Sequence, residues 1–318
     1  MTLTIKNKNA ESTVYLLNME KSILKVLIYF DQFSYPLTCE EILSFLEKPA
    51  EKSGLINTLD ELLKSQKVFK LDNFFSLQND PSLVTRRNKG YQKAANLLVK
   101  AEKISNLLYK FPYVRAVGIS GSLSKYFADE NADIDYFIIT KENRLWIART
   151  LLHLFKKNPF LENRKEYYCM NYFVDEAGLL IEEKNIYTAT ELFTLIPMAG
   201  NKSIKSFFEI NSWSYTYFPN RSLPFVKKDI KTHSPWFKKL AESVLNNKLG
   251  DSIDNYFMRL TTRRWKKKEH EQRLNTKGER MGLKTGKHFS KPNPIFFHDW
   301  LLKKYEKKLD EKRKAWGL

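Results

Sequence analysis

Apolar residues recur at helical spacing in the first fifth of the chain. They dominate residues 22–30, and a second stretch opens at Thr38, which stands three residues before Glu41. That spacing is typical of an N-terminal capping box, so a helix is expected to begin there. The members of a third apolar stripe are Leu55, Leu59, Leu62 and Leu63. Three helices are therefore predicted before residue 65.

A hairpin is predicted next, over residues 68–77, with its turn at Asp72 and Asn73. Three helices closed by a hairpin resemble a winged helix-turn-helix module. We therefore assign residues 1–80 to a winged-helix-like domain.

Such a module binds DNA through its third helix, or serves as a packing or protein-contact domain. A DNA-reading helix presents a basic surface. Here Asp60 and Glu61 balance Lys64 and Lys67. We favour the packing or protein-contact role.

Beyond this domain the pattern alternates between helix and strand. Residues 86–110 carry one apolar stripe, and we assign 81–105 to a connecting helix. The elements expected after it are a strand over 114–120, a strand over 134–140, a helix over 144–157 and a strand over 166–174. This alternation predicts an α+β fold, with a core over residues 106–215.

The composition narrows the partners and the compartment. The 318 residues include 54 Lys and Arg against 36 Asp and Glu, and the net charge of +18 favours polyanionic partners. Two distant cysteines, Cys39 and Cys169, favour neither a disulfide framework nor a zinc site. No apolar run approaches the roughly 18 residues that span a bilayer, and residues 1–18 lack the apolar core of a signal peptide. We expect a cytoplasmic protein with no membrane association.

Gly121 and Ser122 lie where a predicted strand passes into a short helix over 123–127. Free backbone N–H groups at such a turn bind phosphate oxygens, glycine permits close approach, and the Ser122 hydroxyl adds a donor. Lys125 lies one turn further on and would reach a phosphate, although a solvated lysine is the commoner outcome. Gly-Ser pairs are frequent in ordinary turns, so this signal alone is weak.

Asp133 and Asp135 are separated by one residue on a predicted strand. Their side chains then share one face, with Cα atoms about 6.6 Å apart. Two neighbouring carboxylates repel each other unless a cation lies between them, and hard oxygen ligands suit Mg²⁺. A surface turn is the alternative, but the apolar run over 136–139 places the acids at the start of a buried strand.

Together the two halves resemble the nucleotidyltransferase superfamily, whose hallmark is Gly-Ser, about ten residues, and then Asp-x-Asp at a strand. The spacer here is 123–132. The resemblance implies a mixed β-sheet with helices on one side. It also implies attack of a substrate hydroxyl on the α-phosphate of a nucleoside triphosphate, with pyrophosphate leaving. Asp133 and Asp135 would then hold Mg²⁺ or Mn²⁺, and Gly121 and Ser122 would bind the β- and γ-phosphates.

One position departs from that superfamily, in which a third carboxylate stands on a neighbouring strand. We expect Asn171 at the matching position, and a neutral amide cannot act as a base. Glu191 is our first substitute, although an acid near a helix start is also explained by the helix dipole. The acids ranked behind it are Asp175, Glu182 and Glu183.

The segments 169–174 and 187–200 also resemble a group of bacterial nucleotidyltransferase-like proteins with an N-terminal winged-helix domain. No substrate is known for that group. This second resemblance therefore supports the fold and leaves the reaction open.

The last region, 216–318, is predicted to be helical and strongly basic. Residues 256–318 hold about 19 Lys and Arg against about seven acids. Around Trp265 the cations are Arg263, Arg264, Lys266, Lys267 and Lys268, and Arg273, Lys277, Arg280, Lys284 and Lys287 continue the run. Cations interleaved with aromatic rings bind RNA, whereas a solvated helix face is the ordinary explanation of a charge run.

Two functions follow from these patterns. The first is a magnesium-dependent nucleotidyltransferase whose acceptor hydroxyl belongs to RNA, such as a tRNA end, to a small molecule or to a protein. The second is a catalytically weak or inactive relative that acts as a nucleic-acid-binding regulator.

Overall fold

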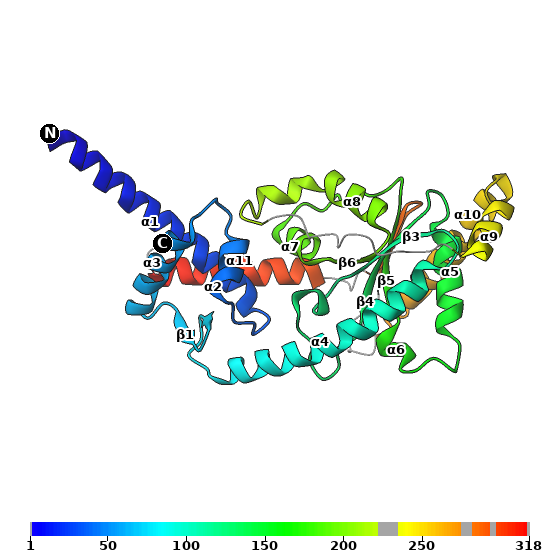
Figure 1. Cartoon of the computed structure of the whole chain (residues 1–318), viewed down its shortest axis with the longest axis horizontal. Coiled ribbons are helices and arrows are strands. Elements are labelled where there is room, and N and C mark those ends of the chain that lie inside the picture. The colour runs from blue at the N-terminus through cyan, green and yellow to red at the C-terminus, as the bar shows by residue number, and fades with distance from the viewer. Residues whose placement is uncertain (1, 222–234, 275–281, 293–296, 317–318) are drawn as a thin grey trace. The chain divides into compact units, whose positions relative to one another are not determined.

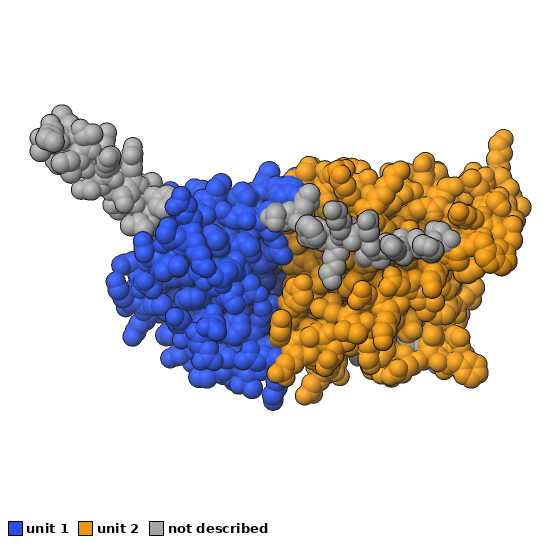
Figure 2. Space-filling view, viewed as in Figure 1, with its two compact units in different colours: residues 1–89, 213–222, 298–318 blue, residues 90–212, 223–297 orange. Residues whose placement is uncertain are grey.

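The computed structural model describes residues 2–221, 235–274, 282–292 and 297–316, with the side chains of all of these but 2–16, 164–165, 171, 292 and 297–299. The chain forms two compact units. Unit 1 comprises residues 1–89, 213–222 and 298–318, and unit 2 comprises 90–212 and 223–297 (Figure 2). Both units thus combine segments that are distant in sequence.

Unit 1 contains the predicted three helices and hairpin. Its elements are α1 (Thr2–Asp31), α2 (Cys39–Phe45), α3 (Lys52–Lys64), β1 (Phe69–Leu71), β2 (Phe74–Ser76), and nearly all of the 3-10 helix η2 (Ser212–Thr216) and of α11 (Phe297–Trp316). The capping box is confirmed, since the Thr38 hydroxyl accepts from Glu41 N–H and the Glu41 carboxylate accepts from Thr38 N–H. The hairpin turns at Asp72, whose φ is +52°. The winged-helix assignment stays a prediction.

The last helix packs against the first inside unit 1. The rings of Tyr29 and Tyr305 meet edge to face with centroids 5.8 Å apart. Lys308 on α11 forms an ion pair with the buried Asp31 at the end of α1. Helix α11 therefore belongs to the N-terminal unit, although the two ends of the chain are far apart in sequence.

Helix α4 (Ser82–Tyr109) matches the predicted helix over 86–110 and passes from unit 1 into unit 2. Unit 2 is built on a six-stranded sheet of order β6-β3-β4-β5-β8-β7. Strands β3, β4, β5 and β6 are labelled in Figure 1. Its strands are β3 (Val114–Ile119), β4 (Asp135–Thr140), β5 (Cys169–Asp175), β6 (Ile196–Ala199), β7 (Leu283–Thr285) and β8 (Phe289–Pro292). Strands β4 and β5 are parallel and every other neighbouring pair is antiparallel, so the predicted mixed sheet of an α+β fold is confirmed.

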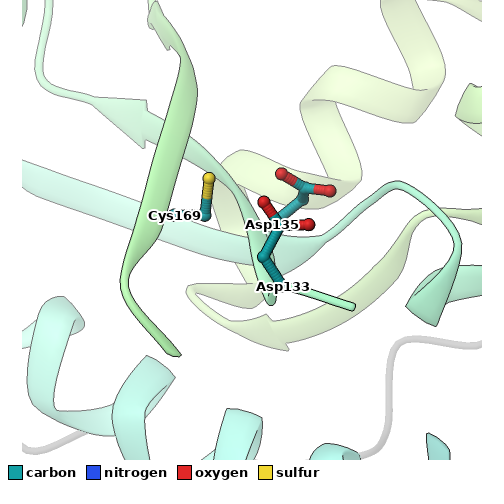
Figure 3. A group of neighbouring side chains, drawn as sticks. All are labelled: Asp133, Asp135 and Cys169. Carbon is teal, nitrogen blue, oxygen red and sulfur yellow. The ribbon is translucent and has the colours of Figure 1, made fainter. Parts of the chain in front are cut away.

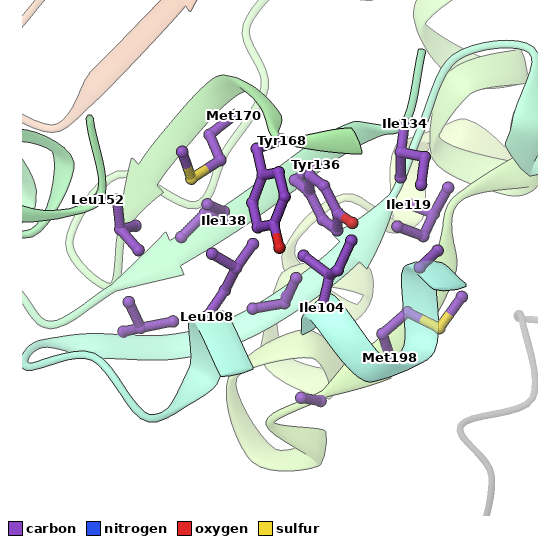
Figure 4. Close-up of a cluster of buried hydrophobic side chains, with 14 of the residues drawn as sticks. Ile104, Leu108, Ile119, Ile134, Tyr136, Ile138, Leu152, Tyr168, Met170 and Met198 are labelled. Atoms are coloured by element: carbon purple, nitrogen blue, oxygen red, sulfur yellow. The ribbon is translucent and has the colours of Figure 1, made fainter. Parts of the chain in front are cut away.

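Helices cover both faces of the sheet, whereas we expected them on one side. On β4, Tyr136 and Ile138 pack into a core with α4 and α5 (Leu145–Lys156) (Figure 4). Phe137 points to the opposite face because side chains alternate along a strand. Its ring lies 4.7 Å from that of Phe207 on α8 (Asn201–Ile210). The uninterrupted apolar run of β4 reflects this two-sided burial.

The C-terminal region, predicted to be helical, also contains strands. Strands β7 and β8 extend the sheet, and Ser290 on β8 pairs with Phe173 on β5. With α9 (Trp236–Val244) and α10 (Lys248–His270) they belong to unit 2, while α11 belongs to unit 1. The expected boundary between 106–215 and 216–318 therefore does not separate compact units. Two strands of three and four residues carry too little periodicity to be recognised in the sequence.

Candidate functional site

The Gly-Ser turn leaves the end of β3, as predicted, but the helix after it is short. Only Leu123–Lys125 are helical, as a single 3-10 turn, η1. A helix of that length has little dipole, so any affinity for phosphate rests on backbone N–H groups and on the exposed Ser122 hydroxyl. A hydrogen bond stabilises the turn, because the buried Ser124 hydroxyl donates to the Gly121 carbonyl over 2.8 Å.

Gly121 lies directly against Asp135. Its φ is +69°, in the left-handed region, and a Cβ placed on it would stand 2.4 Å from the Asp135 Oδ2 atom. Ser120 N–H also donates to the Asp135 carbonyl oxygen over 2.9 Å. The turn and the acid thus lie in contact. The positive φ favours glycine at this position, and a side chain there would displace the Asp135 carboxylate.

Asp133 and Asp135 come together with Cys169 (Figure 3). One possible ligand atom from each of these three half-buried residues lies within 4.8 Å of the other two. Asp135 is the first residue of β4, and Asp133 precedes the strand instead of lying within it. The two carboxylates nevertheless lie close to each other, as the motif predicted. They are on the same side of β4 as the Gly121 turn.

The residue opposite Asp135 is Cys169, where we expected Asn171. Strands β4 and β5 pair Asp135 with Cys169 and Tyr136 with Met170, and the register then shifts so that Phe137 pairs with Tyr172. Asn171 is the extra residue at this bulge, and its side chain lies outside the described ones. The predicted strand began three residues earlier, at Glu166, but residues Arg164–Tyr167 form a short helix, α6.

The thiol changes the chemistry of the donor set. Burial, with the negative charges of Asp135 and Asp133, raises the pKa of the Cys169 thiol well above its usual range. The group is then a neutral thiol beside two carboxylates unless a cation draws off its proton. The carboxylates fit Mg²⁺ or Mn²⁺, whereas a thiolate is a softer ligand that suits Zn²⁺, Co²⁺ or Mn²⁺ better than Mg²⁺.

Glu191 and Lys125 lie at the other side of the Gly-Ser turn. Glu191 comes from α7 (Ile186–Thr194), and its Oε1 atom accepts from Lys125 Nζ over 2.6 Å. Lys125 also donates to the Gly121 carbonyl over 3.0 Å. Glu191 is the sixth residue of α7, beyond the first turn, so the helix dipole does not account for it. It is a partner of Lys125 at the turn and is not in the group formed by the two aspartates.

Two of the other acids considered as substitutes have partners elsewhere. Asp175 is fully buried at the far end of β5 and lies 2.9 Å from Nδ1 of His288. Glu183 pairs with Lys291 over 2.5 Å. Glu182 is exposed. None of the three joins Asp133 and Asp135 among the described groups that could hold a metal.

The basic run lies on the second half of α10. Arg263, Arg264, Lys266 and Lys267 are exposed, and Lys268 Nζ stands 4.8 Å from the ring centre of Trp265. Acids reduce the field, because Glu271 is 2.6 Å from Arg273 and 3.9 Å from Lys267. Cations in the last turn of a helix also interact favourably with the helix dipole. Lys277 and Arg280 lie outside the described residues.

Comparison with protein-family models, with curated proteins and with solved structures finds no match for this chain. Among the described residues, no helix combines the length and the apolar character needed to cross a bilayer. The functional interpretation therefore depends on the geometry of the site.

Cys169 is the residue that sequence reasoning missed. It follows the polar segment 162–167 and opens β5. Nothing in its neighbours distinguishes a buried structural cysteine from one that faces two aspartates. Only the register between β4 and β5 carries that information.

Proposed function

We propose that this protein is a divalent-metal-dependent nucleotidyltransferase that transfers a nucleoside monophosphate from a nucleoside triphosphate to an acceptor hydroxyl. The single observation that carries the proposal is the contact between the Gly121 turn and Asp135, whose carboxylate lies beside Asp133. A phosphate-binding turn then lies next to a cation site, as the chemistry of a metal-bound triphosphate requires.

Each residue of the site has a separate role in the proposed reaction. Backbone N–H groups at Gly121 and Ser122, with the Ser122 hydroxyl, bind the terminal phosphates. Asp133 and Asp135 would hold the cation, which would supply positive charge against the oxygens of the triphosphate. The acceptor oxygen forms a bond to the α-phosphorus, and the bond from that phosphorus to the bridging oxygen breaks to release pyrophosphate. A carboxylate of the pair would take the hydroxyl proton.

RNA is the acceptor that the charge of the chain favours. The exposed cations on α10 and the net charge of +18 suit a polyanion. Lys268 over the Trp265 ring adds a cation–aromatic surface of the kind on which bases stack.

One observation favours a second function. The position opposite Asp135 carries a thiol instead of a carboxylate, and this weakens the case for efficient turnover. A catalytically weak or inactive protein that binds nucleic acid as a regulator is therefore the alternative.

The test is transfer of label from α-labelled nucleoside triphosphates to total RNA, with Mg²⁺ or Mn²⁺, and release of pyrophosphate. Asp135→Asn should lower turnover by about 100-fold or more, because it removes a cation ligand. Glu130→Gln, on the exposed loop just before the acids, removes one negative charge outside the group and should leave turnover unchanged.

Absence of label transfer with each of the four nucleotides and both metals would overturn the enzyme proposal. If salt-sensitive RNA binding then persists equally in Asp135→Asn, the regulatory alternative is favoured.

A further inference from the structure

Unit 1 holds a cavity of about 530 Å³ that is separate from the site described above. It lies between α1 and α11, with the segment that follows α2 at its border. Five of its lining residues are cations and one is an acid: Lys21, Lys25, Lys48, Lys312, Arg313 and Glu47. That volume is within the range of pockets that hold small ligands.

Helical spacing explains how the cations reach one space. On α1, Lys21 and Lys25 are four residues apart and share a face. On α11, Lys312 and Arg313 stand three and four residues after Leu309, which lines the same cavity. Two helix faces thus contribute two cations each, and Lys48 adds the fifth.

The walls of the cavity are held in place by contacts that do not use the charged groups of the lining cations. The Tyr29–Tyr305 ring contact and the Lys308–Asp31 ion pair fix α11 on α1. Asn220 holds the segment that carries Glu47 and Lys48, because its amide donates to the Lys48 carbonyl over 2.7 Å and accepts from Ala50 N–H over 2.8 Å. The cations are therefore gathered by the fold before any ligand binds.

The positive charge inside is largely unbalanced. Glu47 pairs with Lys25 over 2.5 Å, and Arg313 is 3.4 Å from Asp310, which does not line the cavity. Lys312 lies 4.6 Å from the ring centre of Trp316. Within the described part of the chain, no ion pair neutralises Lys21 or Lys48. Like charges around one space repel each other, and a bound anion relieves that repulsion.

We propose that this cavity binds a compact polyphosphorylated anion. Glu47 offsets Lys25 and Asp310 offsets Arg313, so three positive charges of the lining remain, which match a ligand with several negative charges. Lysine and arginine are side chains that bind phosphate oxygens. The described lining contains no aromatic ring on which a base would stack, and it includes the carboxylate of Glu47. Both features favour a small phosphorylated ligand over a nucleic-acid strand.

Inorganic tripolyphosphate is the probe, titrated calorimetrically into the full chain at 50 mM salt. Lys312→Ala with Arg313→Ala should weaken binding about tenfold or more, because two of five cations are lost. Glu47→Gln should tighten it, since the acid of the lining is neutralised and Lys25 is released. The matched control is Lys303→Ala with Lys314→Ala, which removes the same charge from exposed positions of α11 outside the cavity and should change affinity less than twofold.

Three results would overturn the proposal. The first is that Lys312→Ala with Arg313→Ala leaves the affinity for tripolyphosphate unchanged. The second is that the control pair loses as much affinity, and the third is that Glu47→Gln does not bind tripolyphosphate more tightly. A single-stranded RNA oligonucleotide that binds more tightly than tripolyphosphate, with the same dependence on Lys312 and Arg313, would assign the cavity to nucleic acid instead. Circular dichroism establishes that each variant is folded, and the opposite sign expected for Glu47→Gln cannot arise from partial unfolding.

Discussion

Asp135 and Cys169 pair with each other at the start of the parallel strands β4 and β5. One possible ligand atom from each of Cys169, Asp133 and Asp135 lies within 4.8 Å of the other two. A soft donor therefore stands where the resemblance to nucleotidyltransferases implies a hard one. That substitution bears on which metal the site prefers and on how fast it turns over.

Cys169→Asp should raise the affinity for Mg²⁺ about tenfold and lower that for Zn²⁺, because it replaces a thiol by a carboxylate. Competition of Mg²⁺ against Mn²⁺, followed by the paramagnetic resonance of free Mn²⁺, measures the change. Turnover with Mg²⁺ in the presence of nucleoside triphosphate and RNA should rise in parallel.

Cys39→Asp is the matched control for that experiment, since Cys39 is a half-buried cysteine at the start of α2 in the other unit. It should leave metal affinity unchanged. Equal Mg²⁺ affinity in Cys169→Asp and the unaltered protein would show that the residue opposite Asp135 does not contribute to the cation site.

Gly121→Ala should lower the free energy of unfolding by about 1–2 kcal/mol from its positive φ alone, and it should also displace Asp135. Metal-dependent nucleotide binding should then fall by more than the loss of folded protein explains. Urea unfolding and nucleotide titration of the same variant separate the two effects.

Asn143→Ala provides the comparison for Gly121→Ala. Asn143 also has a positive φ, +57°, but it follows the other end of β4. The Asn143→Ala variant should be less stable than the unaltered protein, but its folded form should keep its affinity for nucleotide. Similar losses of nucleotide affinity in both variants would attribute the effect to general destabilisation.

Glu191→Gln should tighten triphosphate binding by about three- to tenfold, because it releases Lys125 from an ion pair and leaves its charge for the phosphates. Lys125→Met should weaken binding by a similar factor. A double-mutant cycle isolates the coupling between the two side chains. If Glu191→Gln instead abolishes turnover at unchanged nucleotide affinity, Glu191 acts in the chemical step and is not only a partner of Lys125.

Asp254 on α10 predicts a pH-dependent contribution to stability. Burial raises its pKa from 3.8 to about 6, although Ile147 N–H donates to it over 2.9 Å and the positive charge of Arg144 opposes the shift. Asp175 adds a smaller effect in the same direction as burial. The folded protein therefore binds this proton more tightly than the unfolded chain does.

The sign follows from linkage. Stability contributed by the neutral carboxyl is present below about pH 4 and is lost as the pH rises towards 6, by about 3 kcal/mol at most. Asp254→Asn should match the unaltered protein near pH 4 and exceed it in unfolding free energy at pH 7. Urea unfolding at both pH values tests this, and a difference that does not vary with pH would contradict it.

Much of the fold was predictable because it depends on local patterns. The capping box at Thr38 and Glu41, the turn at Asp72 and the strand over 135–140 all arise from neighbouring residues, and the structure contains each of them. Elements that need a distant partner are the exceptions. Here they are β7 and β8, because β8 pairs with β5, more than 100 residues earlier in the chain, and β7 joins the sheet only through β8.

By itself the sequence determined the Gly-Ser turn, the two neighbouring aspartates and the order of helices and strands around them, because side-chain alternation and turn chemistry act over a few residues. Tertiary structure alone decided that Cys169 faces Asp135, that Lys125 and Glu191 pair beside Gly121, and that cations from α1 and α11 surround one cavity. Each of those contacts depends on the register of two strands or on the packing of two elements distant in sequence, and neither leaves a periodic trace along the chain.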